Sequence, residues 1–194
     1  MARVPYPTRD EYPSAHLAAY DRMLRERGDP ALHIFAALAN IPNLLDPLLT
    51  FTREMREGAV IEARLRELAI MTVALATGAT YEFNHHWNAA LEAGLRREQL
   101  EHLADAETSD AFDGRERAIV RYAREATVSL NVSDEIWSAL RGHFSVRETM
   151  DVVMAVAWYN AVARMLVPLE IEMEDWHERH EVVDSEFPKR ARPA

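Results

Sequence analysis

The chain has 194 residues, of which 48% are hydrophobic, and its formal net charge is -10. This length fits one domain, and so acidic a chain has no general attraction to nucleic acid or to anionic membrane surfaces. The sequence contains no cysteine, which excludes disulfides, thiolate metal ligands and thiol-based catalysis. Because of the acidic net charge, we expect neither nucleic-acid nor membrane partners.

The first 13 residues carry three prolines and no apolar core segment. Proline-rich composition is typical of an extended segment, so an N-terminal arm is predicted over 1–13. Nothing in this stretch resembles a signal peptide, and no apolar run in the chain reaches the length needed to cross a bilayer. The expected localisation is cytoplasmic.

Apolar spacing and capping residues predict a series of helices after the arm. In chain order they cover 14–27, 29–40, 42–57, 61–77, 80–93, 96–105, 113–130, 134–143, 146–166 and 170–182. Asp29 before Pro30 is typical of an N-cap with proline at the first helical position. Gly78 is expected to end the helix over 61–77 in a left-handed conformation, and Thr80 to cap the next helix.

The later helices carry further start signals. Asp113 and Glu116 have the spacing of a capping box, as do Ser145 and Glu148, and Ser133 is a good N-cap. No glycine-, proline- or serine-rich linker divides the chain. The pattern predicts a single all-α domain over 1–194, ending in a tail over 182–194. The strongly apolar helices over 61–77 and 146–166 are expected at its centre.

The stretch "YEFNHHW" opens the helix that follows Gly78. On a helix Glu82 and His86 lie one turn apart and share a face, and Glu82 also reaches His85. Phe83 and Trp87 belong to a separate apolar stripe that is typical of core packing. The acid and histidine are therefore either an exposed helix pair or part of a site to which other polar groups contribute.

Two further polar features stand in apolar surroundings. Glu67 lies where its helix turns from charged to apolar, either as a partner of Arg64 or as a site residue. Tyr159, Asn160 and Arg164 interrupt the apolar helix over 146–166. Polar groups in such a helix must find partners or line a cavity. They are therefore the next candidates for a site.

The chain resembles the carboxymuconolactone decarboxylase family, which includes alkylhydroperoxidase D-like proteins. The resemblance is carried by the stretch "ARLRELAIMTVALATGATYEFNHHWNAALEAGLRREQLEHL" and extends to "FDGRERAIVRYA" and "VVMAVAWYNAVARML". It implies an alkylhydroperoxidase D-like helical bundle. It also implies a homo-oligomer, a trimer or a hexamer, whose small-molecule pocket lies at or near the subunit contacts.

In the peroxidase branch of that family a Cys-x-x-Cys pair precedes the histidine, and an upstream glutamate completes a proton relay. Aligned on His86, the cysteine positions fall on Ala79 and Glu82, and the upstream glutamate falls on Glu67. A thiol peroxidase needs a thiolate nucleophile, so that activity is excluded for this chain.

The decarboxylase branch lacks the cysteine pair and carries a Glu-x3-His segment that Glu82 and His86 resemble. This implies a cofactor-free enzyme acting on a small carboxylated or lactone substrate, in which His86 delivers a proton and Glu82 or Glu67 orients it. Substrate binding falls to Arg164 as a carboxylate clamp, to Tyr159 and Asn160 as neutral donors, and to His85. No metal or other cofactor is expected.

Two alternatives stay open at the sequence level. Glu82 with His85, and Glu174 with His177, have the Glu-x-x-His spacing of carboxylate-bridged metal sites in helical bundles. The chain could equally be a non-catalytic oligomeric protein that binds a small ligand. Which of His85 and His86 faces the site also stays open, with His86 favoured. The remaining histidines are interpreted as structural or solvated.

Overall fold

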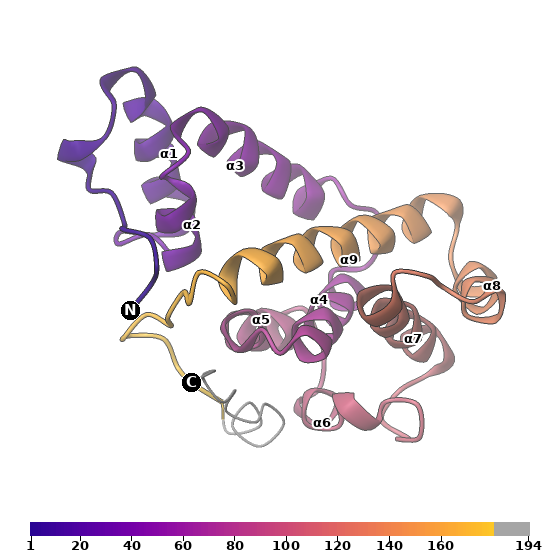
Figure 1. The fold of residues 1–194 in the computed structure, drawn as a ribbon. Helices are drawn as coiled ribbons and strands as arrows, with labels where there is room; N and C mark the ends of the chain where they lie inside the picture. The colour runs from indigo at the N-terminus through magenta and orange to yellow at the C-terminus, as the bar shows by residue number, and fades with distance from the viewer. Residues whose placement is uncertain (181–194) are drawn as a thin grey trace. The chain divides into compact units, whose positions relative to one another are not determined.

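A computed structural model describes residues 1–180, and these residues form helices and connecting segments without any β-strand. The α-helices are α1 (Leu17–Arg27), α2 (His33–Leu38), α3 (Pro42–Glu57), α4 (Ala63–Thr77), α5 (Thr80–Glu92), α6 (Arg97–Glu101), α7 (Gly114–Ser129), α8 (Asp134–His143) and α9 (Val146–Leu166) (Figure 1). Short 3-10 turns are η1 (Arg9–Glu11), η2 (Ser14–His16) and η3 (Leu103–Asp105). The all-α prediction is confirmed.

The chain divides into two compact units. The first comprises Met1–Gly58 and Met165–His177, and the second comprises Ala59–Arg164 and, among the described residues, 178–180. The predicted tail over 182–194 lies outside the described residues. Within residues 1–180, no helix combines the length and apolar character that a membrane crossing requires.

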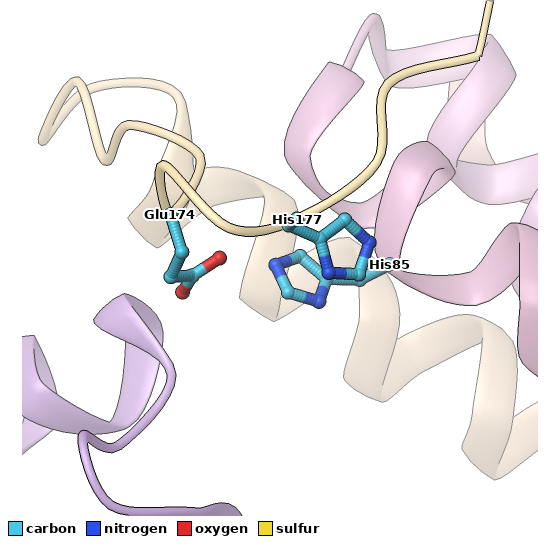
Figure 2. Close-up of side chains that lie close together, drawn as sticks. All are labelled: His85, Glu174 and His177. Carbon is cyan, nitrogen blue, oxygen red and sulfur yellow. The ribbon is translucent and has the colours of Figure 1, made fainter.

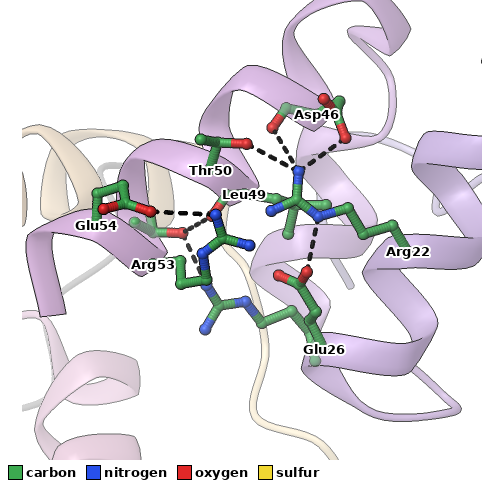
Figure 3. A network of polar contacts seen from close by, with 9 residues as sticks. Arg22, Glu26, Asp46, Leu49, Thr50, Arg53 and Glu54 are labelled. Atoms are coloured by element: carbon green, nitrogen blue, oxygen red, sulfur yellow. Dashed lines mark hydrogen bonds and ion pairs between the residues drawn. The ribbon is translucent and has the colours of Figure 1, made fainter. Parts of the chain in front are cut away.

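In the first unit, α1 and α3 pack together over a core that includes Met23, Leu45 and Leu49. Above this core the guanidinium of Arg22 joins the two helices, donating to Asp46 Oδ1 at 2.8 Å and to the hydroxyl of Thr50 at 2.8 Å (Figure 3). The predicted start of α3 at Pro42 and its end at Gly58 are confirmed. Local apolar patterning therefore gave this part of the fold correctly.

The prediction that Asp29 caps a helix was wrong. The helix α2 starts only at His33, after Leu32 in an extended conformation. The amide of His33 donates to Oε1 of Glu174 at 2.6 Å, within the same unit. A carboxylate 141 residues away in the sequence thus satisfies a helix amide that the local sequence was expected to satisfy.

The predicted helix over 170–182 was also wrong for the part that the structure describes. The chain leaves α9 through a turn in which Ile171 N donates to Leu166 O and Glu170 has a left-handed φ of 53°. The N-terminal arm holds this turn, since Arg3 N donates to Leu169 O at 2.8 Å. Contacts with the arm thus replace the local helical preference, and no helix follows up to His180.

The second unit is built around α4, whose residues from Leu65 to Ala74 are all buried. Gly78 ends α4 with a φ of 68°, as predicted, and the tight turn lets α5 pack beside α4 (Figure 1). The expected cap at Thr80 was off by one residue, because Ala79 occupies the N-cap and Thr80 is already helical. This hairpin fixes how the side chains of α4 and α5 face each other.

Around this hairpin, α7 packs on α4, and the predicted capping box of α7 is confirmed by reciprocal bonds between Asp113 and Glu116. Glu116 also pairs with Arg64 of α4. At the start of α9, Oδ2 of Asp151 accepts the amide of Val60 at 2.7 Å and so fixes the entry to α4. These bonds hold α4 in a defined register within its unit.

Candidate active site

An acid–histidine cluster lies in the second unit, on the facing sides of the hairpin formed by α4 and α5. Glu67 comes from α4, and Glu82 and His86 come from α5. All three side chains are buried. The spacing of four residues brings Glu82 and His86 to one face of α5, and the hairpin turns that face toward Glu67.

His86 is held between the two carboxylates. Its Nδ1 lies 2.7 Å from Oε2 of Glu67, a hydrogen-bond distance, and its Nε2 lies 3.3 Å from Oε2 of Glu82. Among residues 1–180, that Glu82 oxygen accepts no hydrogen bond. His86 therefore makes a hydrogen bond to Glu67 and a longer contact to Glu82. Oε2 of Glu82 is a buried acceptor that has no hydrogen bond within residues 1–180.

This environment changes the charge of His86. Burial lowers the pKa of His86, but the attraction and hydrogen bond of Glu67 and the contact with Glu82 raise it more, to about 9. An imidazolium with two N–H donors is thus the dominant form at neutral pH. The cluster thus holds a proton on the buried imidazole of His86.

The histidine that sequence reasoning favoured is the one at the cluster. His85, its neighbour, is only partly buried, and its ring packs on Tyr81 with centroids 4.3 Å apart. One residue along a helix is a rotation of about 100°, so the two rings point to different sides of α5.

Of the expected residues on α9, Tyr159 reaches the cluster. Its ring meets that of His86 edge-on, with centroids 4.9 Å apart, and it is buried. Asn160 turns toward α7 instead, where it donates to the hydroxyl of Thr127 at 2.8 Å. Arg164 is exposed, and its NH1 donates to Oδ1 of Asn160 at 2.7 Å. The structure thus brings together four of the seven predicted site residues, namely Glu67, Glu82, His86 and Tyr159. Asn160 and Arg164 bond to each other instead.

One residue of the cluster was missed by sequence reasoning. Arg66 is buried, and its NH2 lies 3.6 Å from Oε1 of Glu67. The signal for it was the Arg-Glu pair at the point where α4 becomes apolar, which was interpreted through the glutamate alone. An arginine at the edge of an apolar helix is usually a solvated residue, so its burial could not be predicted from the local pattern.

The two Glu-x-x-His pairs of the metal alternative differ in structure. On α5 the carboxylate of Glu82 contacts His86, one residue beyond His85. Glu174 and His177 lie on the irregular segment after α9 (Figure 2). On that segment the amide of His177 donates to the carbonyl of Glu174. Glu82 and His85 belong to the second unit, whereas Glu174 and His177 belong to the first unit.

Residues 42–125 match the carboxymuconolactone decarboxylase family, and the matched segment contains Glu67, Glu82 and His86. The chain is therefore similar to this family over the segment that carries the cluster. No curated protein matches the chain in sequence.

Several solved structures of this family's fold are similar to the chain. The debrominase Bmp8, solved as a variant in complex with 2,3,4-tribromopyrrole, gives a TM-score of 0.75 with 16% identity over 94% of each chain. A peroxidase-related protein from Silicibacter sp. gives 0.76 with 17% identity, over 91% of this chain and 93% of that chain. A protein from Ralstonia eutropha described as an alkylhydroperoxidase AhpD core gives 0.66 with 18% identity, over 90% and 93%. At these identities the likeness establishes an alkylhydroperoxidase D-like fold.

Proposed function

We propose that this chain is a cofactor-free acid–base enzyme that acts on a small carboxylated or lactone substrate, by decarboxylation or a related proton transfer. The observation that carries the proposal is the buried position of His86 between Glu67 and Glu82. Buried titratable groups with strongly shifted pKa values cluster at functional sites, because structure alone rarely requires them.

The chemistry follows from the protonated state of His86. In the decarboxylation of a lactone acid conjugated to its carbonyl, the bond to the carboxylate breaks and carbon dioxide leaves. The electron pair of that bond passes into the conjugated carbonyl and forms an enolate. The Nε2 proton of His86 is then transferred to carbon, and a proton from solvent restores the imidazolium. Protein groups stabilise the oxyanion in the meantime.

Each member of the cluster has a proposed role in this sequence. Glu67 holds Nδ1 and keeps the ring oriented, as carboxylates do for catalytic histidines. Glu82 contributes the buried oxygen beside Nε2, which can accept the proton of a substrate group. Tyr159 packs against the ring, and its hydroxyl is the proposed donor to a substrate oxygen. Substrate contacts by His85, Asn160 and Arg164 remain predictions, and for Arg164 they would require it to leave Asn160.

Sulfur chemistry is not open to this chain. The sequence has no cysteine, so neither a thiol peroxidase nor any reaction through a thiolate can be inferred from relatives of similar fold. Acid–base chemistry needs only the groups that the cluster contains. We also propose, from the family resemblance, that the protein works as a cytoplasmic trimer or hexamer, which light scattering on the purified protein will test.

The test is turnover of carboxymuconolactone and related lactone acids, followed by carbon dioxide release and by loss of substrate absorbance. His86→Gln removes the acid, and we expect a loss of at least 100-fold, as is typical for a general acid. Glu82→Gln and Glu67→Gln preserve side-chain size and are expected to lose less. His102→Gln is the matched control, because His102 is exposed in the turn that follows α6.

Four outcomes decide between these functions. Turnover that falls in the cluster variants and not in the control supports the proposal. Turnover that is unchanged in His86→Gln overturns the site. Binding of the lactones without any turnover would favour the non-catalytic alternative, and stoichiometric transition metal in protein purified without a histidine tag would favour the metal alternative.

A further inference from the structure

Arg66 is a buried cation in the wall of the site. It follows Leu65 in the first turns of α4, and its side chain is only 10% exposed. Burying a guanidinium costs several kcal/mol unless charged or polar partners replace its water shell. Packing alone does not explain a buried guanidinium at the point where α4 becomes apolar.

Glu67 connects this cation to the histidine. Its two oxygens are divided: Oε1 lies 3.6 Å from NH2 of Arg66, and Oε2 lies 2.7 Å from Nδ1 of His86. The Glu67 side chain is 2% exposed, so solvent screens these contacts poorly. Arg66 therefore acts on His86 through a carboxylate that both of them hold.

The charges of the cluster are balanced only when Arg66 is included. With His86 protonated, two cations, Arg66 and His86, stand against two anions, Glu67 and Glu82. Without Arg66, a buried cluster of net negative charge would remain. Such a cluster binds protons more tightly, because a nearby negative charge favours the protonated form of every titratable group around it.

We propose that Arg66 is a positioning residue that acts on His86 through Glu67, and that its positive charge limits how tightly the cluster holds its proton. A histidine that holds its proton too tightly is a poor acid, since proton transfer is most efficient when the pKa lies near the working pH. The effect of Arg66 on catalysis rests on the proposed function, whereas its effect on the pKa of His86 does not.

Among residues 1–180, the groups that contact His86 are Glu67 from α4, Glu82 from α5 and the ring of Tyr159 from α9. None of these supplies a positive charge. Arg66 is thus the residue whose removal changes the charge balance of the cluster without removing a direct contact of the imidazole.

The test is an NMR titration of the protein labelled with ¹⁵N-histidine, in which the His86 signals are identified by their loss in His86→Gln. Arg66→Met removes the charge and keeps much of the side-chain volume. We expect the pKa of His86 to rise by about one unit, the lower end of the effect of a close charge. Arg66→Lys retains the charge and is expected to stay close to the wild-type value.

Arg64→Met is the matched control, since Arg64 lies on the same helix and pairs with the buried Glu116 rather than with Glu67. A purely structural role for Arg66 would lower the unfolding free energy of the Arg66 variants and leave the pKa of His86 unchanged. An unchanged or lowered pKa in Arg66→Met overturns the proposal. If that variant does not fold, Arg66→Gln carries the same expectation.

The titration requires no substrate, so its outcome is independent of turnover. Absence of carbon dioxide release would count against the proposed function alone. If the enzyme is active, the basic limb of the pH–rate profile should move upward in Arg66→Met together with the pKa from NMR, and Arg66→Lys should restore both.

Discussion

The protonation of His86 makes the unfolding free energy of the protein depend on pH. Burial lowers the pKa of His86, but Glu67 and Glu82 raise it from 6.5 to about 9 in the folded chain. The folded state therefore binds this proton more tightly than the unfolded chain does. The resulting stabilisation is fully present below pH 6.5 and is lost as the pH rises through about 9.

The magnitude follows from the elevation of the pKa. A rise from 6.5 to about 9 corresponds to about 3 kcal/mol, at about 1.4 kcal/mol for each pKa unit. His86→Gln removes the titrating group and should therefore flatten this part of the stability profile. The variant will also be less stable at low pH, because Glu67 and Glu82 lose their cation.

The assay is urea unfolding of wild type and His86→Gln, at about pH 6 and about pH 9.5. The difference in unfolding free energy between the two proteins should shrink by about 3 kcal/mol between these values. The exposed His102 provides the control, because His102→Gln should leave the profile of the wild type unchanged. A difference that does not depend on pH, or that grows as the pH rises, would refute the ion-pair account of the cluster.

Three further predictions concern residues of the second unit. Glu67→Gln should lower the pKa of His86 measured by NMR, because Glu67 contributes most of the attraction that raises it. Asp113→Ala removes the side chain that accepts the amide of Glu116 at 2.8 Å and should cost about 1 kcal/mol in urea unfolding, whereas the same change at the exposed Asp110 should cost less than about 0.5 kcal/mol. Leu68→Ala empties a position of 0% exposure in α4 and should cost about 2–5 kcal/mol.

The hairpin that carries the site could be predicted because its determinants are local. Gly78 specifies a left-handed helix end, and the run of apolar residues before it specifies a buried helix. The spacing of Glu82 and His86 then decides which faces meet. These signals lie within about twenty residues, so tertiary structure had little opportunity to override them.

The errors arose where distant residues supply what the local sequence was expected to supply. Asp29 has the right chemistry for a cap, but Glu174 satisfies the first amide of α2. The segment after Glu170 has helical composition, yet Arg3 pairs with the turn that ends α9. Capping and termination are worth only about 1 kcal/mol each, so a single long-range hydrogen bond is enough to reverse them.

The composition of the cluster explains why residue types alone left its role open. Glu82 and His86 on an exposed helix would be a pair of minor energetic effect, with a histidine that titrates in its ordinary range. Burial by itself would push the histidine toward its neutral form, and only a second carboxylate from another helix reverses that effect. The difference between a surface pair and a proton donor is therefore made by Glu67, and the charge of Glu67 is in turn stabilised by Arg66. A sequence shows each of these residues, but the division of the Glu67 oxygens between arginine and histidine exists only once α4 and α5 are packed.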